Sequence, residues 1–175
     1  MQEPWLGKSL ERVEDLSLLR GQGQFADDLA TPPGACHAAF LRSPLAHAEI
    51  RAINTTKALA LPGVVAVITG DDILIHSKPF ITGVKVAAPQ YALATDRVRY
   101  VGEPVAIVVA ADRYLAEDAL DAIDVEYAAL PALVDPEQAA QPAAQKLHPE
   151  VASNVLHERD FRYGDPRQAF ADARH

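Results

Sequence analysis

The stretch Val98-Arg99-Tyr100-Val101-Gly102-Glu103-Pro104-Val105-Ala106 decides how this chain folds. The glycine and the proline at residues 102–104 bend the chain. An apolar run then extends from Val105 to Ala111, and it has the length and the β-branched residues of a buried strand. The stretch therefore predicts a turn that leads directly into a strand of the core.

The residues after this strand change their periodicity twice. Asp112 is a suitable N-cap for a helix, and one face of that helix is apolar while the other is charged. The apolar stripe consists of Leu115, Ala116, Ala119, Leu120 and Ile123. From Ile123 to Tyr127 apolar and acidic residues alternate, which is typical of a strand with one buried face. A strand, a helix and a strand are therefore expected in succession.

Two strands are predicted nearer the N-terminus, from Ala35 to Leu41 and from Ala46 to Ile53. Arg42-Ser43-Pro44 forms the connection between them. In the second strand we expect Ala48, Ile50 and Ala52 on one face, and the polar residues between them on the other, because side chains alternate along a strand.

A second strand, helix and strand sequence follows from these two strands. Asn54 or Thr55 can cap a short helix that runs to Leu61, where Pro62-Gly63 stops it. The β-branched residues from Val64 to Thr69 predict a buried strand. From Asp71 to Gln90 we expect a loop, with a brief turn at residues 71–73.

These elements predict an α/β (α+β) fold class, with a mixed β-sheet built from β-helix-β units. Pro32-Pro33-Gly34 separates an N-terminal arm, residues 1–34, from a domain at residues 35–137. The arm is expected to contain one helical turn near its leucines. Residues 138–175 are expected to be a linker, extended or mobile between residues 138 and 145. Asp135-Pro136 and Asp165-Pro166 each predict the start of a short helix.

Composition and charge exclude several classes of function. The 175 residues carry a formal net charge of −8, which argues against nucleic acid as a partner because phosphate binding depends on Lys and Arg. No apolar stretch approaches the ~18–20 residues that span a bilayer, so no membrane partner is expected. Glu3 stands where a secretory leader would carry a basic residue, and a cytoplasmic location is therefore expected.

The cysteine and the histidines do not predict a metal site. Cys36 is the single cysteine, so it permits no internal disulfide, and we expect it to be a small buried residue. The six histidines show no spacing that would place two ligands on one metal, and they are expected on the surface or on strand faces. They are His37, His47, His76, His148, His157 and His175.

Other motifs favour structural interpretations over chemical ones. Residues 21–26 match a dinucleotide-binding fingerprint in form, but the strand that should precede it and the helix that should follow it are not predicted. Asp118, Asp121 and Asp124 recur at helical spacing beside the apolar stripe, which predicts a solvated face. No serine lies in the setting of a nucleophile elbow. The residues alone thus predict a domain without a recognisable active site.

Three segments, in this order, resemble one family. They are Phe40 to Ile50, Ala60 to Ile73, and Val98 to Pro136, the last with its Val101-Gly102-Glu103-Pro104 and Leu130-Pro131 steps. Together they resemble the α/β hammerhead domain of the large, molybdopterin-binding subunits of xanthine dehydrogenase, aldehyde oxidase and carbon-monoxide dehydrogenase. The arm also resembles the lead-in to that domain, and the similarity covers nearly the whole chain.

The resemblance implies an oxidoreductase that hydroxylates aldehydes or N-heteroaromatic rings at a molybdenum–pterin cofactor, with iron–sulfur and FAD partners. It also implies that the family's cofactor pocket lies in a part of the subunit that this chain does not include. We therefore assign no catalytic, cofactor-binding or metal-binding residue here, and expect a structural and assembly role, inactive alone. The alternative is a free-standing interaction or ligand-binding module with the same fold.

Gly102, Glu103 and Pro104 are the candidate contact with the remainder of the molybdopterin-binding subunit. A bend before a buried strand presents its backbone to a neighbour, which is the reason for this hypothesis. A turn that serves only the fold explains the same residues equally well. The two interpretations stay open on the sequence alone.

Overall fold

The computed structural model describes residues 5–81, 83, 88–161 and 163–174. The chain separates into two compact units, Met1–Ala35 and Cys36–His175. The first unit contains the helix α1 (Asp15–Leu19), at the predicted helical turn, and a 3₁₀ helix, η1 (Ala26–Asp28). None of its described residues is buried. Residues 5–35 therefore form no hydrophobic core of their own.

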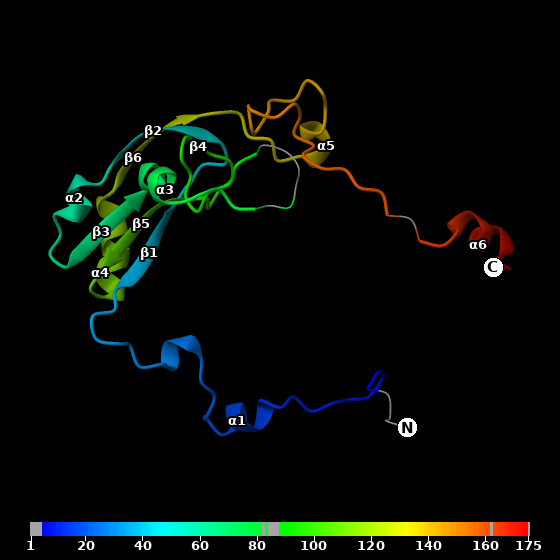
Figure 1. Cartoon of the computed structure of the whole chain (residues 1–175), viewed down its shortest axis with the longest axis horizontal. Helices are drawn as coiled ribbons and strands as arrows, with labels where there is room; N and C mark the ends of the chain where they lie inside the picture. Colours follow the sequence, from blue (N-terminus) through cyan, green and yellow to red (C-terminus); the bar gives the residue numbers. More distant parts are fainter. Residues whose placement is uncertain (1–4, 82, 84–87, 162, 175) are drawn as a thin grey trace. The chain divides into compact units, whose positions relative to one another are not determined.

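The second unit contains two small sheets, and the predicted buried strand is the central strand of the first one (Figure 1). That sheet has the order β1 (His37–Arg42), β5 (Pro104–Ala110) and β3 (Val64–Thr69). Both pairings are antiparallel. Because β5 has a partner on each side, it is the most buried strand, whereas β3 lies at the edge and exposes 62% of Val65. The prediction of a buried strand was thus right for β5, but β3 is only partly buried.

The second sheet has the order β4 (Arg97–Val98), β2 (Ala48–Asn54) and β6 (Asp124–Ala129), again with antiparallel pairings. The register of β2 against β6 shifts between Ile50 and Ala52. This irregularity reverses the predicted alternation, because Ala52 is exposed and Ile53 packs against the core instead.

The fold class is confirmed as α/β, but one feature of the prediction is wrong. The strands form two antiparallel sheets rather than one mixed sheet. Each predicted β-helix-β unit exists along the chain, yet its two strands belong to different sheets: α2 (Thr56–Leu59) joins β2 to β3, and α4 (Arg113–Asp118) joins β5 to β6. Periodicity along the chain indicates the type of an element but not the strand with which it pairs.

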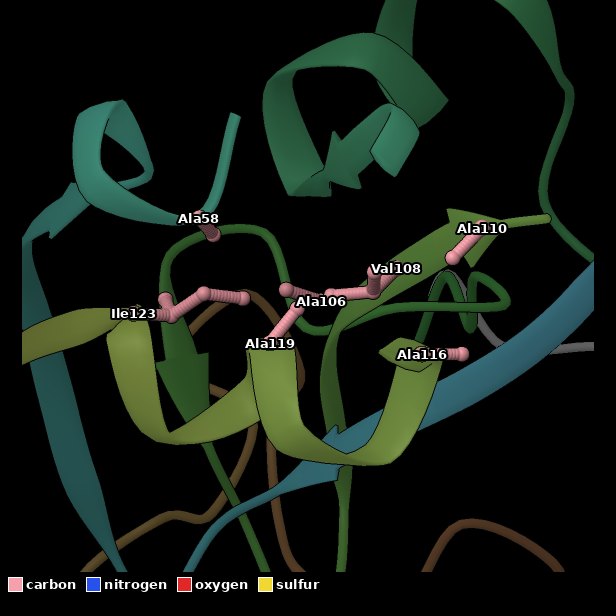
Figure 2. Packing of buried hydrophobic residues seen from close by; sticks show 7 residues of the cluster. All are labelled: Ala58, Ala106, Val108, Ala110, Ala116, Ala119 and Ile123. Carbon is pink, nitrogen blue, oxygen red and sulfur yellow. The ribbon is translucent and has the colours of Figure 1, made fainter. Parts of the chain in front are cut away.

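The main core lies between the first sheet and the helical segments α2, α4 and η2 (Ala119–Ala122). Asp112 Oδ1 accepts a hydrogen bond from the amide of Leu115 at 2.9 Å, which confirms the predicted N-cap of α4. The stripe continues into η2, which is a 3₁₀ helix. Figure 2 shows the buried side chains of this core, which come from α2, from β5 and from the segment of α4 and η2; they are Ala58, Ala106, Val108, Ala110, Ala116, Ala119 and Ile123.

A smaller core lies on the opposite side of β5. Val105 points away from the helices, because successive side chains of a strand face opposite sides. It joins Ala48, Ala94 and Val98 in a second buried cluster. The start of β5 therefore connects the first sheet to the second.

The expected turn at residues 71–73 is instead a helix, α3 (Gly70–His76). Asp72 Oδ2 accepts hydrogen bonds from the Thr69 amide at 2.8 Å and from the Thr69 hydroxyl at 3.0 Å, which stabilises the first turn. Residues 82 and 84–87 of the expected loop lie outside the described residues. In the described part of the chain, no helix has the length and the apolar character that a bilayer span requires.

Two short helices begin where the Asp-Pro pairs predicted them, α5 (Pro136–Ala139) and α6 (Pro166–Asp172). The residues between them differ from the expected extended linker. The Asn154 side chain donates to the carbonyls of Ala139 and Gln145, each at 3.0 Å, and accepts from the amide of Leu147 at 2.8 Å. This amide side chain folds residues 139–154 into a compact loop, which composition alone did not indicate.

Candidate interface at the turn before β5

The turn at residues 102–104 is tied by its backbone to the end of β1. Gly102 has a φ of +89°, in the left-handed region that favours glycine. Its amide donates to the carbonyl of Ser43 at 2.8 Å, and the amide of Ser43 donates to the carbonyl of Glu103 at 2.9 Å. Arg42 Nη1 donates to the carbonyl of Gly102 at 2.8 Å. These main-chain groups thus already make hydrogen bonds inside the domain.

The side chain of Glu103 faces Arg99, the residue that directly follows β4. Its Oε2 accepts a hydrogen bond from the amide of Arg99. Arg99 is largely buried, with 15% of its side chain exposed, and donates through Nη2 to Asp96 Oδ1 at 3.1 Å and through Nη1 to the carbonyl of Arg97 at 3.1 Å. Its Nε is buried without a hydrogen-bond partner among the described residues. The guanidinium is therefore fixed in place but not fully satisfied.

A pocket of about 570 Å³ opens beside these residues. It is lined by the polar groups Asp96, Arg99 and Glu103, and by His148 and Glu150 from the loop at residues 139–154. His148 Nδ1 lies 3.1 Å from Glu150 Oε1. The pocket thus has three carboxyl groups and one guanidinium, with a mixed but mainly acidic character.

Burial and charge shift the pKa values of two of these carboxyl groups in opposite directions. Burial raises the pKa of Glu103 above its usual value, although the amide and the charge of Arg99 oppose this. Burial also acts to raise the pKa of Asp96, but hydrogen bonds and charges from Arg97 and Arg99 outweigh it and lower that pKa. Of the two, Glu103 has the less compensated negative charge.

Two histidines and the cysteine lie where the sequence did not predict them. His47 and His148 are buried, with 4% and 8% exposed, whereas surface or strand-face positions were expected. His47 Nδ1 lies 2.9 Å from the carbonyl of Pro131, so Nδ1 is the donor, and Nε2 is buried without a hydrogen-bond partner among the described residues. Cys36 is exposed, and its predicted burial is wrong. It lies two residues after the Pro-Pro-Gly boundary and directly before β1.

The remaining candidates have structural roles. Asp118, Asp121 and Asp124 are exposed, which confirms the predicted solvated face, and Asp124 Oδ2 accepts from Lys57 Nζ at 2.8 Å. At residues 21–26, the described chain has the short helix α1 before the glycines and a 3₁₀ helix after them, rather than the strand and the helix that dinucleotide binding requires.

The described residues do not fit a molybdenum–pterin cofactor. They contain no group of three or more His, Cys, Asp or Glu side chains that could hold a metal ion. A pterin that carries a phosphate requires several hydrogen-bond donors close together. The pocket instead has three carboxyl groups, and its guanidinium already donates to Asp96 and to the carbonyl of Arg97. The chemistry of that cofactor is therefore not assigned to these residues.

Fold and site together define a small α/β domain with a structured turn and a polar pocket at one end of its central strand. Comparison with known proteins identifies the family of this domain. Residues 20–131 match the family of aldehyde oxidase and xanthine dehydrogenase a/b hammerhead domains. The chain belongs to this family.

Three similar proteins illustrate the family. The carbon monoxide dehydrogenase large chain of Afipia carboxidovorans is 41% identical over 153 residues, which are 86% of this chain and 18% of that protein. The nicotine 6-hydroxylase large subunit of Paenarthrobacter nicotinovorans is 38% identical, covering 97% of this chain and 21% of that subunit. The solved aldehyde oxidoreductase of Desulfovibrio gigas is 28% identical with a TM-score of 0.72, covering 94% of this chain and 19% of that one. The chain thus spans about a fifth of the length of these three relatives.

Proposed function

We propose that this chain is the hammerhead portion of a molybdenum hydroxylase large subunit, with a role in structure and assembly, and that it is inactive alone. The observation that carries the proposal is an apolar rim beside the pocket. Phe80 and Tyr100, which line the pocket, are 60% and 56% exposed, and Val101, which follows Tyr100 in the chain, is 64% exposed. Apolar side chains gathered at one site favour a surface that a neighbour covers. We call the part of the subunit that the relatives have and this chain lacks the large-subunit remainder.

The proposed contact with the large-subunit remainder is the turn Gly102, Glu103 and Pro104 together with the apolar rim. Since the backbone of the turn is bonded to Ser43 and Arg42, the contact is made by the rim side chains and by the Glu103 carboxyl group. Glu103 is half-buried and has a raised pKa, so a hydrogen-bond donor from the neighbour would stabilise its charged form.

For the complete enzyme we propose hydroxylation of aldehydes or N-heteroaromatic rings at a molybdenum–pterin cofactor, with iron–sulfur and FAD subunits as partners. Membership of the family supports this class of reaction, and the relatives named for nicotine and aldehydes span both substrate types. A cytoplasmic location is proposed with it. The single cysteine, which allows no internal disulfide, is compatible with a reducing compartment.

We propose the same domain limits that the sequence predicts. Residues 1–34 are the arm, residues 35–137 are the hammerhead domain, and residues 138–175 are the linker and the start of the molybdopterin-binding region. The compact loop held by Asn154 then lies within this last segment and adds His148 and Glu150 to the pocket.

A free-standing ligand-binding module is the second candidate. The observation in its favour is the pocket itself, which at about 570 Å³ has the size of a small-molecule site and contains a partly unsatisfied Arg99. A module of this kind would bind its ligand without the large-subunit remainder, so the two functions separate in one experiment.

That experiment is co-purification of the tagged chain with the large-subunit remainder from the same organism. The assembly function predicts a stoichiometric complex, and it predicts that Glu103→Ala weakens the complex while Glu126→Ala, on the exposed side of β6, does not. If the tagged wild-type chain purifies without the large-subunit remainder, the assembly function is contradicted. A complex that is unchanged by Glu103→Ala would remove the turn from the interface.

A further inference from the structure

We propose that the pocket beside the turn is a binding site for an organic cation, a guanidinium or ammonium group that carries an apolar part. All the residues that line it belong to the unit Cys36–His175. Glu103 is the main charge partner of the cation, and the aromatic side chains of Phe80, Tyr91 and Tyr100 receive its apolar part. This inference goes beyond the proposed function, because the site needs no large-subunit remainder in order to exist.

The walls of the pocket are held by hydrogen bonds within the domain. The amide of Phe80 donates to the carbonyl of Gln90 at 2.7 Å, and both residues line the pocket. In the compact loop, the amide of Leu147 donates to Asn154 Oδ1 at 2.8 Å, which holds residues 147–150 in place. Segments far apart in the sequence thus enclose one cavity of about 570 Å³, a size that is typical of small-molecule sites.

The carboxyl groups of the pocket are not fully balanced by neighbouring cations. Asp96 Oδ2 lies 3.0 Å from Arg97 Nε, and its Oδ1 lies 3.1 Å from Arg99 Nη2. The charge of Arg99 also acts on Glu103 and Glu150, so three carboxyl groups share two guanidinium groups. When all three are ionised, these five side chains have a net charge of −1. One monovalent cation would balance it.

Glu103 has the greatest unused capacity to bind a cation. Its Oε2 accepts a hydrogen bond from the amide of Arg99, whereas a carboxylate can accept about four. Burial raises the pKa of Glu103, so its negative charge is only partly compensated. Burial also acts on Asp96 and Glu150, but hydrogen bonds and neighbouring charges outweigh it and lower their pKa values. A cation in the pocket would therefore gain most from Glu103.

The chemistry of the lining argues against other classes of ligand. An anion would meet three carboxyl groups, and the guanidinium of Arg99 already donates to Asp96 and to a main-chain carbonyl. A metal ion requires several ligand atoms that converge on one point, and in the described part of the chain no three His, Cys, Asp or Glu side chains do so. An organic cation fits better, because aromatic faces attract guanidinium and ammonium groups and cover their apolar part.

Calorimetric titration of the full chain with two probes tests the site, at a mildly basic pH where histidine is ordinarily neutral. Phenylguanidinium is a cation, and phenylurea is a neutral molecule of nearly the same shape. We expect the cation to bind about tenfold more tightly, because hydrogen bonds between charged groups are the stronger ones. The amide NMR signals of Arg99, Tyr100 and Glu103 should shift with the same affinity. Equal affinities for the two probes, or shifts confined to residues outside the pocket, would overturn the inference.

Substitutions of single carboxyl groups locate the charge that binds the cation. Glu103→Gln keeps the shape of the side chain and removes its charge, so it should weaken phenylguanidinium binding about tenfold. Glu150→Gln should weaken it by a smaller factor, and it decides the matter if Glu103→Gln does not fold. Glu126→Gln, at an exposed position of β6 outside the pocket, should leave the affinity unchanged. An equal loss in all three variants, or no loss at Glu103 and Glu150, would contradict a specific site.

The same titration separates the possible sources of the cation. If the complex with the large-subunit remainder still binds phenylguanidinium, the ligand is a free small molecule. If the remainder displaces the probe and binds the Glu103→Gln chain more weakly, the cation is an arginine or lysine side chain of the remainder. Binding that appears only after Lys8, Arg12 and Arg20 are replaced by alanine would assign it to this chain's own arm. Each of these results supports a cation site, whereas no binding in either background overturns it. A chain that forms no complex but binds the probe would contradict the proposed function alone.

Discussion

The amide of Ser43 donates a hydrogen bond to the carbonyl of Glu103 at 2.9 Å, and this contact joins the end of β1 to the turn before β5. The register of the two strands shifts at the same place, between Leu41 and Arg42. Beyond the turn, the carbonyl of Pro104 accepts from the amide of Ala94 at 2.8 Å. The first residues of β5 are thus bonded both to the first sheet and to the segment that precedes the second sheet.

Gly102→Ala should destabilise the domain by about 1 kcal/mol, because alanine is strained at a φ of +89°. No heavy atom would lie within 4 Å of the added Cβ, so the cost is in the backbone alone. Urea unfolding of the chain measures it. Gly34→Ala is the matched control: it has a φ of +78° and open space around it, but it lies in the first unit, so the unfolding transition of residues 36–175 should not move.

Val108→Ala should cost about 2 kcal/mol of unfolding free energy, since Val108 is fully buried on the central strand and the substitution removes two carbons from the main core. Val65→Ala on the edge strand β3, where the side chain is 62% exposed, should cost less than about 0.5 kcal/mol. Comparable losses at the two positions would contradict the placement of β5 between β1 and β3.

Asp112→Ala should cost about 1 kcal/mol, because it removes the hydrogen bond to the amide of Leu115 at the N-terminus of α4. Thermal unfolding of this variant can be compared with that of Asp121→Ala, which removes an exposed carboxylate from η2 that caps no helix. If both variants unfold at the temperature of the wild type, Asp112 does not stabilise the helix.

Glu103 should make the stability of the chain depend on pH in a defined direction. Burial raises its pKa in the folded state, so the folded state binds the proton more tightly than the unfolded state. The resulting stability is present at low pH and is lost as the pH rises through the raised pKa. Relative to Glu103→Gln, which has no titrating group at this position, the wild type should lose unfolding free energy between acidic and neutral pH. A difference between the two proteins that stays constant over this range, or that grows in favour of the wild type, would contradict the burial of the charge.

The sequence predicted the types of most elements, because periodicity and capping depend on residues close together in the chain. The stripe on α4, its Asp112 cap and both Asp-Pro helix starts were found in this way. The helix α3 was missed although a signal was present, since Thr69 and Asp72 have the spacing of a capping box before an apolar run. The sorting of the strands into two antiparallel sheets could not be predicted, because pairing depends on contacts between distant segments.

The candidate site was predictable only in its location. Gly102, Glu103 and Pro104 were identified from the bend, but their hydrogen bonds to Ser43 and Arg42 depend on the pairing of β1 with β5. The pocket depends on a segment at residues 147–150 that looked like a linker, and the burial of His148 had no sequence signal. Such features arise where distant segments meet, which a pattern along the chain does not report.

The measurement that tests the central claim most directly is molybdenum and pterin analysis of the purified chain, alone and in its complex with the large-subunit remainder. We predict that the chain alone retains neither, and that the complex contains molybdenum in stoichiometric amount. Molybdenum bound by the chain alone, or a complex that forms without it under conditions in which molybdenum is supplied, would contradict the assignment of this chain as the assembly domain of a molybdenum hydroxylase.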